Sequence, residues 1–476
     1  MKKTNPLAPH PFHGQHTGRP MRPAVHPAAG TARRMPVGRP STLLAALLLS
    51  LGPGPTALAQ GAPPAPAQSN IDIKDVQAPG LYLLPRVEFE FETLRNRRLE
   101  SKDIRQIDDY KPAAIMALRW QGEGRWALVN ETEFRYDTKH ETDRGTEGKA
   151  KLFINQLYGE AQLPEWNSAV RIGRWGFKDD REWLADTELD GVQLLHQRDD
   201  WKATVFAARR NRWEKDLLHD TDTRGDGTNY IGLMGAYELG DKHDLVVRVF
   251  DQRHSDSDLR LTHYSVASYA SPRKGPFQHW AMLSLVDGKD QGTKVQGQAI
   301  DVGGTWLVSD EGYRPRVTLG YAWGSGDANP DDGKDRAHRQ TGLQDNQGRF
   351  GGQSSFRLYG ETLDPTLSNL HVLTAGIGMA PGKRSSLDLV YHHYRQDKVA
   401  DVRDTNLRPR HDRQTERHLG NGIDLIWGWR ADRRLKLEAA AGMFQPNERF
   451  RDGRGASAAK AKTAYSAWFE VKYQLQ

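Results

Sequence analysis

The chain lacks cysteine altogether and, within its 476 residues, lacks any apolar stretch long enough to cross a bilayer as a helix. The absence of thiols fits an oxidising compartment in which none is needed. A membrane-spanning helix needs ~20 consecutive apolar residues. The longest apolar segment, Leu43–Leu51, is about half of that length. The lack of a longer apolar segment argues against a helical membrane protein.

Acidic residues are absent from the first 59 positions, which hold seven Lys or Arg. Leu43–Leu51 forms a short apolar core, and Ala57–Ala59 offers small residues for cleavage. We therefore predict that residues 1–59 are a signal peptide cut near Gln60. Met35 is an alternative start, because translation from it would give a signal of ordinary length.

Removal of the signal changes the charge argument. The whole chain has a formal net charge of +6, and loss of the seven leader cations leaves −1. A nucleic-acid-binding function therefore loses its support. The low mean hydropathy is typical of soluble proteins. A low mean hydropathy is also compatible with a membrane β-barrel, because only alternate residues of its strands meet lipid.

Alternation of apolar and charged residues is the main pattern after residue 80. In Arg86–Glu92 one face of a strand carries charge and the other is apolar, and Tyr465–Tyr473 repeats the pattern. A soluble sandwich would show the same alternation, so the surrounding features must decide. Eighteen strands are predicted, an even count as bacterial barrels require, at 81–92, 113–120, 125–136, 151–163, 168–175, 188–196, 201–210, 229–239, 243–252, 262–270, 277–286, 299–309, 315–324, 370–380, 386–395, 422–429, 435–444 and 464–475.

The connections alternate between short and long. Short turns such as Gln121–Gly124 and Gly240–Lys242 separate long charged segments, for which we predict loops at Thr138–Lys149, Trp213–Thr228 and Ser325–Asn369. Short turns belong to the periplasmic end of a barrel and long loops to the outside. The sequence thus predicts an all-β protein: an antiparallel transmembrane β-barrel over residues 81–476, preceded by a flexible lead-in at 60–80, in the outer membrane of a Gram-negative bacterium.

The signal and the barrel predictions share one test. Protein recovered from outer membranes should begin near Gln60, and it should migrate faster on a gel unheated than boiled. N-terminal sequencing and a pair of gel lanes measure both properties. An unprocessed, water-soluble chain would contradict the barrel.

Two groups of short motifs carry a resemblance to a known family. One comprises Val170–Trp175 and Asp180–Thr187; the other comprises Gln340–Asn346, Tyr359–Glu361 and Leu367–Leu370. Their order and spacing are similar to those of the alginate-export outer-membrane channels, and the resemblance runs from about residue 81 to the C-terminus. It implies a monomeric barrel of eighteen strands that passes an acidic polysaccharide of mannuronate and guluronate outward.

The resemblance also implies a path for the polymer. Asp186 matches the acidic lumen residue of the family, and Arg209 and Asp216 fall in a similar charged stretch. Arginines of such a path attract polymer carboxylates, which a guanidinium holds by two parallel hydrogen bonds. Strand alternation, independently of the resemblance, places Arg86, Glu131, Arg135, Arg171, Arg248 and Arg316 on the interior face. The predicted pore-lining residues are Arg86, Arg135, Arg171, Arg174, Asp186, Arg209, Asp216, Arg248 and Arg316. Expected partners are alginate, outer-membrane lipid, and periplasmic export and polymer-modification proteins; no cofactor, metal or nucleic acid is expected.

The chain departs from the family pattern in three ways, of which the first two concern this path and the third concerns the signal for barrel assembly. Asn155-Gln156 stands where an interior Arg-Glu pair is expected, and Lys436 and Glu438 stand where arginine is expected. The turn Arg430–Arg434 is short where the family has a long periplasmic loop over the pore. The terminal aromatic of many barrels is replaced by Gln476. We therefore expect a pore that is less electropositive than that of the family. We expect no periplasmic lid from this turn.

Enzyme motifs are weak. Asp327–Gly333 is a poor calcium-binding loop, because its glycine is misplaced and a proline interrupts it. Gly324–Gly326 is not the nucleophile elbow of a hydrolase, because no helix follows it. His392-His393 places one imidazole on each face of a strand, so the two are unable to share a metal ion. We therefore predict a channel and not an enzyme, with a general or oligosaccharide-selective diffusion porin as the alternative to polymer export. We further expect part of Ser325–Asn369 to pack into the barrel mouth, and arginines to lie closest to the axis and give a mild anion preference.

Overall fold

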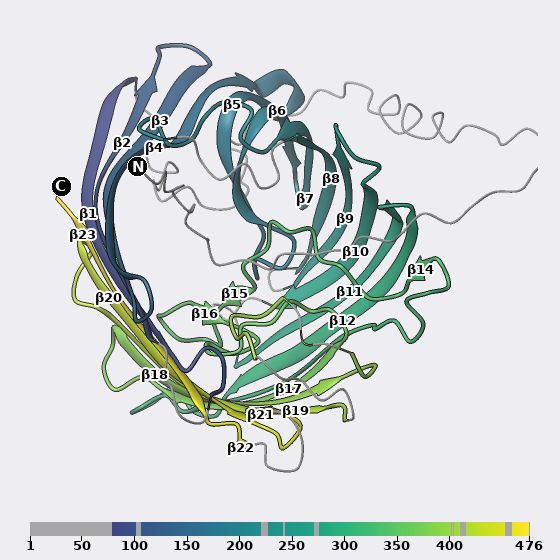
Figure 1. The fold of residues 1–476 in the computed structure, drawn as a ribbon. Helices are drawn as coiled ribbons and strands as arrows, with labels where there is room; N and C mark the ends of the chain where they lie inside the picture. The colour runs from purple at the N-terminus through teal and green to yellow at the C-terminus, as the bar shows by residue number, and fades with distance from the viewer. Residues whose placement is uncertain are drawn as a thin grey trace, which may run out of the picture. The chain divides into compact units, whose positions relative to one another are not determined.

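The computed structural model describes residues 79–100, 106–219, 227–240, 243–270, 276–400, 402, 404–409, 416–452 and 459–475. The predicted signal peptide, most of the predicted lead-in, and Gln476 lie outside the described residues. Eighteen antiparallel strands form a closed barrel, seen down its interior in Figure 1. Their bounds are β1 (Gly80–Arg95), β2 (Gln106–Gln121), β3 (Trp126–Glu141), β4 (Gly145–Leu163), β5 (Ser168–Lys178), β6 (Asp186–Arg198), β7 (Trp201–Arg209), β8 (Thr228–Leu239), β9 (His243–His254), β10 (Arg260–Ala270), β11 (Phe277–Asp290), β12 (Thr293–Leu307), β13 (Arg316–Gly324), β17 (Leu370–Met379), β18 (Ser385–Gln396), β19 (His418–Arg430), β20 (Leu435–Pro446) and β23 (Ala464–Gln474).

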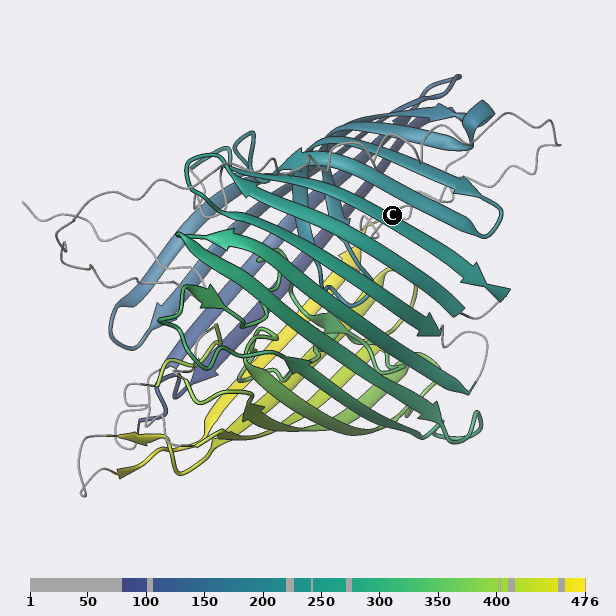
Figure 2. The ribbon, with the colours of Figure 1, turned by 90° about the vertical axis from the view of Figure 1, so that its right-hand side faces the viewer.

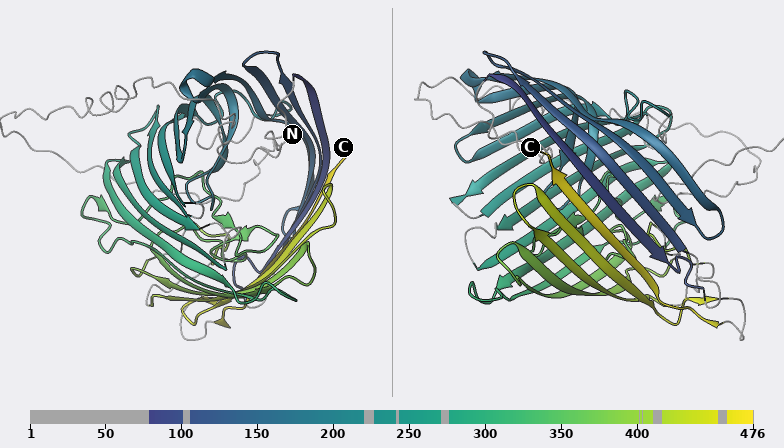
Figure 3. Two further views of the ribbon diagram at one scale, coloured as in Figure 1. Left: turned by 180° about the vertical axis from the view of Figure 1, so that it is seen from behind. Right: turned by 90° about the vertical axis from the view of Figure 1, so that its left-hand side faces the viewer.

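Each strand pairs with its neighbours in the chain, and β1 pairs with β23 to close the ring. Closure leaves no unpaired sheet edge, which is the condition for a sheet to cross a bilayer. Figures 2 and 3 show the strands running obliquely around the wall. Short elements complete the described chain: the 3-10 turn Pro164–Trp166, β14 (Lys334–Asp335), β15 (Gln347–Gly348), β16 (Phe356–Arg357), β21 (Arg451–Asp452) and β22 (Ala459–Lys460).

All eighteen predicted strands are present, with several longer than predicted. The prediction of a loop over Thr138–Lys149 is wrong, because β3 and β4 continue as a hairpin that turns only at residues 142–144. The extension carries polar residues on both faces, so it lacks the alternation that reveals a lipid-facing strand. The long connections after β7 and β13 are confirmed.

The two faces of the wall differ as the alternation predicts. On β1, Leu81, Leu83 and Phe89 are exposed on the outer face, whereas Arg86 is buried on the inner face. The same contrast appears on β18, where His392 is buried and Leu389 is exposed. Exposed apolar side chains cover the outside because lipid, rather than protein, is their solvent. Among the described residues, no helix has the length and apolar character needed to span a membrane.

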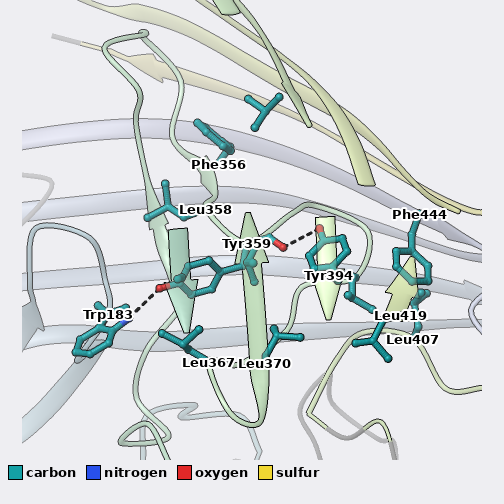
Figure 4. Packing of buried hydrophobic residues seen from close by; sticks show 14 of the residues in the cluster. Trp183, Phe356, Leu358, Tyr359, Leu367, Leu370, Tyr394, Leu407, Leu419 and Phe444 are labelled. Carbon is teal, nitrogen blue, oxygen red and sulfur yellow. Dashed lines mark hydrogen bonds between the residues drawn. The ribbon is translucent and has the colours of Figure 1, made fainter. Parts of the chain in front are cut away.

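Part of the connection between β13 and β17, residues 325–369, folds into the barrel, whereas its β14 extends the wall beside β12. We call the whole connection the inserted segment. Its Phe356, Leu358 and Tyr359 are buried in one apolar cluster with wall residues that include Tyr394 and Phe444, as Figure 4 shows. The backbone oxygen of Tyr359 accepts a 2.9 Å hydrogen bond from the Tyr394 hydroxyl. The structure thus confirms that part of this connection packs inside the barrel.

A glycine makes room for one of the interior ion pairs. Arg316 of β13, Gly378 of β17 and Asp388 of β18 are neighbours in register. The Arg316 guanidinium reaches across β17 and binds both Asp388 oxygens at 2.6–3.0 Å. A Cβ atom on Gly378 would lie 2.2 Å from Asp388 Oδ1. Only glycine therefore lets the two charges meet over the intervening strand.

Candidate functional site

The candidate site is a cavity of about 900 Å³ between the inserted segment and the barrel wall. The inserted segment contributes residues from Gln347 to Glu361. The wall contributes side chains of β1, β3, β4, β5, β6, β9, β10, β11, β20 and β23 and of the connection between β5 and β6. A volume of this size accommodates a few sugar rings, within the range of ligand pockets.

Carboxylates outnumber cations on the cavity lining. Eleven Asp or Glu residues line it, against six Lys or Arg. The acids are Glu90, Glu92, Glu131, Asp180, Glu182, Asp186, Glu188, Asp244, Glu361, Glu438 and Glu470; the bases are Lys178, Arg181, Arg349, Arg357, Lys436 and Lys472. The surface that a passing molecule meets is therefore acidic.

Further cations lie behind this acidic surface. Lys111, which does not line the cavity, binds Glu90 at 2.8 Å and Glu92 at 3.1 Å. Arg86 in the same way binds Glu131 at 3.1 Å. The expectation that arginines lie closest to the axis stays a prediction. At these positions, however, the carboxylate lines the cavity and the cation lies behind it. The physical reason is desolvation: a cation crowded between strands is stabilised by turning along the wall to a neighbouring carboxylate.

The cations on the lining itself are also mostly paired. Lys472 binds Glu470 at 2.8 Å and Lys436 binds Glu438 at 2.5 Å. Arg349 differs, because its side chain is exposed to the cavity and makes no ion pair with any residue that the structure describes. It is therefore the guanidinium of the lining that is free to meet a ligand.

A buried polar network fixes the inserted segment to the wall. The Tyr359 hydroxyl accepts a 2.9 Å bond from Trp183 Nε1 and donates a 2.9 Å bond to Asp301 Oδ2; Figure 4 shows the first. Asp301 also accepts from Trp280 Nε1 at 2.7 Å and from Arg181 at 3.2 Å. All five side chains are buried. Such a network holds one position of the segment, because displacing it would strand several buried polar groups.

A second contact joins the inserted segment to the connection between β5 and β6. Carboxylate oxygens of Glu182, Asp186 and Asp345 lie within 4.8 Å of one another. Lys178 neutralises part of this charge, with its Nζ 2.9 Å from Asp186 and in contact with Glu182. Burial, and next the neighbouring Asp186, raise the pKa of Glu182 to about 7. Asp186 is thus the predicted site residue that lies on the cavity lining.

The other predicted residues of β1 to β5 lie on the wall in ion pairs. Arg86 binds Glu88 and Glu131. Arg135 binds Asp137 at 2.7 Å and stands over the Phe153 ring. Arg171 binds Glu160, its neighbour in register, at 2.7 Å. None of these three lines the cavity, and their contact with a polymer stays a prediction.

Arg174, Arg209 and Asp216 lie near the connection between β7 and β8. Arg174 binds both oxygens of Asp190, at 2.6 and 2.8 Å, and the backbone oxygen of Trp213. Asp216 accepts from the backbone N–H of Leu152 at 3.2 Å. Through these contacts the connection runs beside β4 at Leu152 and Ile154. Arg209 ends β7 in register with Asp190.

Arg248 and Arg316 complete the predicted set. Arg248 is buried, 3.4 Å from the Tyr269 hydroxyl and 4.0 Å from Asp179. Arg316 forms the pair with Asp388 described above. Neither lines the cavity. Their partners hold them in the wall, and any direct role in transport stays a prediction.

Sequence reasoning missed Arg349, Arg357 and Arg181. The first two lie in the inserted segment, and the third lies in the connection between β5 and β6. Strand alternation gives no signal for loop residues, so only the unusual length of the β13–β17 connection pointed to this region.

Two of the departures from the family have clear structural counterparts. Asn155 sits at a β-bulge opposite Glu131 and Thr132, and its amide donates a 2.7 Å bond to Glu133. The turn from Arg430 to Leu435 closes with a backbone bond of 3.0 Å between Ala431 N and Leu435 O. A turn this short is unable to cover the lumen.

Comparison with known structures supports the fold. OccK7 (OpdD) of Pseudomonas aeruginosa has a TM-score of 0.54 at 12% identity, covering 83% of this chain and 98% of its own. OccK2 (OpdF) of the same organism has a TM-score of 0.51 at 12% identity, covering 83% and 100%. OccAB3 of Acinetobacter baumannii has a TM-score of 0.51 at 11% identity, covering 83% and 99%. At such low identity the likeness is one of fold alone.

Comparison of sequences gives the family. The profile of the alginate export family, described as "Alginate export", matches residues 83–463. The search of curated proteins finds no match. The match covers most of the chain and includes the inserted segment, most of the cavity lining and the barrel as far as β20, but not β23. The chain therefore belongs to the alginate export family and is an outer-membrane export channel, not an enzyme.

Proposed function

We propose that this channel exports an acidic polysaccharide of the uronate class, with alginate as the first candidate. The observation that carries the proposal is the charged cavity, in which cations are present but almost all already bound to carboxylates. A polymer carboxylate has to compete with a resident one for each cation. Contacts are then weak and repeated along the path, as transport of a long chain requires, since a tight site would retain it.

The acidic surface favours a second candidate substrate, an uncharged oligosaccharide. The eleven carboxylates against six cations on the lining repel a polyanion, and Lys111 and Arg86 behind the lining offset part of this repulsion. The same lining shifts the expected preference for small ions from anions toward cations. Ion preference alone therefore tests the lining, whereas block by sugar oligomers tests the substrate.

Arg349 provides the sharpest test. Mannuronate oligomers added to the channel in a planar bilayer should block its current, and Arg349→Gln should weaken the block on the order of tenfold, the value of one charge-assisted hydrogen bond. Block should also weaken as salt rises, because charges are screened over about 8–10 Å at physiological ionic strength.

Lys383→Gln is the matched control, since Lys383 is an exposed cation in the short turn between β17 and β18. It should leave the block unchanged. Equal block by uncharged gluco-oligomers, with no effect of Arg349→Gln, would favour the neutral-substrate candidate and reject the uronate proposal.

A further inference from the structure

Five cations form a continuous row across five strands at one end of the barrel. Arg253 and Arg260 are direct neighbours between β9 and β10, and Arg260 faces Lys289 of β11. Lys289 faces Lys294 of β12, which in turn faces Lys334 of β14. All five side chains are exposed. We call this set the cation row; at about 4.8 Å between strands it extends over about 19 Å.

The cation row lies on the outer face of the wall. On β11 the same face carries the exposed Leu283 and Leu285, and on β10 it carries Tyr264 and Val266. Figure 2 shows this wall from outside. The row therefore does not face the cavity, and the predicted polymer path runs on the other side of the sheet.

The position of the cation row along the membrane normal matches that of the lipid headgroups. Lys289 lies four residues beyond Leu285, the last apolar residue of the outer face of β11. At about 3.4 Å per residue and a tilt of about 40°, the row stands about 10 Å beyond the apolar band. The end concerned is the one from which the long connections after β7 and β13 emerge. This is the outer leaflet side of an outer-membrane barrel.

Neighbouring acids compensate only part of the charge. Asp251 binds Arg253 at 2.5 Å, and Asp258 binds Lys289 at 3.2 Å. Asp287, on the same face, accepts instead from Gln296 at 3.1 Å. The remaining members of the row, Arg260, Lys294 and Lys334, make no ion pair with any described residue.

Like charges directly opposite each other on neighbouring strands destabilise a sheet. Anions beside a row of five in register would therefore stabilise it. Arginine and lysine bind phosphate oxygens through short charge-assisted hydrogen bonds. We propose that the cation row binds the phosphate groups of lipid headgroups in the outer leaflet, so that the channel carries an annular lipid site on β9–β12 and β14. This inference rests on the outer-membrane location and not on the identity of the exported polymer.

The test uses the full-length processed channel in detergent, titrated with a diphosphorylated diglucosamine lipid and followed by native mass spectrometry. The variant R260Q/K294Q/K334Q removes the three unpaired cations. It should bind the lipid on the order of tenfold more weakly or worse, since each charge-assisted contact is worth about that factor. The dephosphorylated form of the lipid should bind the parent protein with a similar loss.

The control variant K383Q/R433Q/R434Q removes three exposed cations from the short turns at the opposite end. It should bind as the parent does. Equal losses in both variants, an unchanged affinity in the first, or equal binding of the dephosphorylated lipid would overturn the proposal. Displacement of the lipid by mannuronate oligomers would assign the row to the polymer instead. The gel shift of unheated samples checks folding; if the triple variant fails it, K294Q/K334Q replaces it.

Discussion

Replacing Arg174 by alanine should lower the free energy of unfolding of the barrel by about 3–5 kcal/mol, because it leaves a buried carboxylate without its partner. The Asp190 carboxylate is buried and accepts two bonds from this guanidinium, at 2.6 and 2.8 Å. Arg174 also donates to the backbone oxygen of Ile154 at 3.1 Å and to that of Trp213. One side chain thus joins β5, β6, β4 and the connection after β7.

Urea unfolding in phospholipid vesicles, followed by tryptophan fluorescence, measures the loss. Arg125→Ala is the matched control, because Arg125 and Glu165 form an ion pair of similar length, 2.5 Å, with both side chains more than half exposed. It should cost less than about 1 kcal/mol. The double variant R174A/D190A should recover part of the loss, since it leaves no unpaired buried charge. A loss for Arg174→Ala no larger than for Arg125→Ala would show that the site is hydrated.

The strands could be predicted because their information is local. In β1 the alternation of Val87, Phe89 and Phe91 with Arg86, Glu88 and Glu90 reports directly that one side meets lipid and the other does not. The β3–β4 hairpin beyond Tyr136 could not be predicted, because the local alternation ends there. Outside the bilayer both faces are wet, so the sequence keeps no period there even though the ladder continues to Glu141.

The arrangement of charges in the lumen could not be predicted, because it depends on contacts between distant residues. Alternation placed Arg86 and Glu131 inside, and both are there. Which of the two faces the cavity is decided by packing across β1, β2 and β3, which no local pattern records. Arg349 lies in a connection where strand periodicity is silent, and its exposure follows from the path of the inserted segment.

Loss of one hydroxyl should loosen the inserted segment. Tyr359→Phe leaves the buried Trp183 N–H without its acceptor and removes one donor from Asp301. Each unsatisfied buried group costs about 1–3 kcal/mol, so the segment should leave the wall at least about tenfold more often. The single-channel conductance should rise accordingly, because the segment occupies space inside the barrel.

A thiol placed in the segment reports its release. Ser354 is buried, and the chain has no cysteine, so Ser354→Cys introduces one shielded thiol of similar shape. A bulky maleimide should label it about tenfold faster or more when Tyr359→Phe is also present. Tyr391→Phe is the matched control, because it removes a hydroxyl of the outer face that donates to Asn421 at 2.8 Å. Equal labelling rates in the two phenylalanine variants, with unchanged conductance, would mean that the apolar cluster around Phe356 and Leu358 holds the segment without the network.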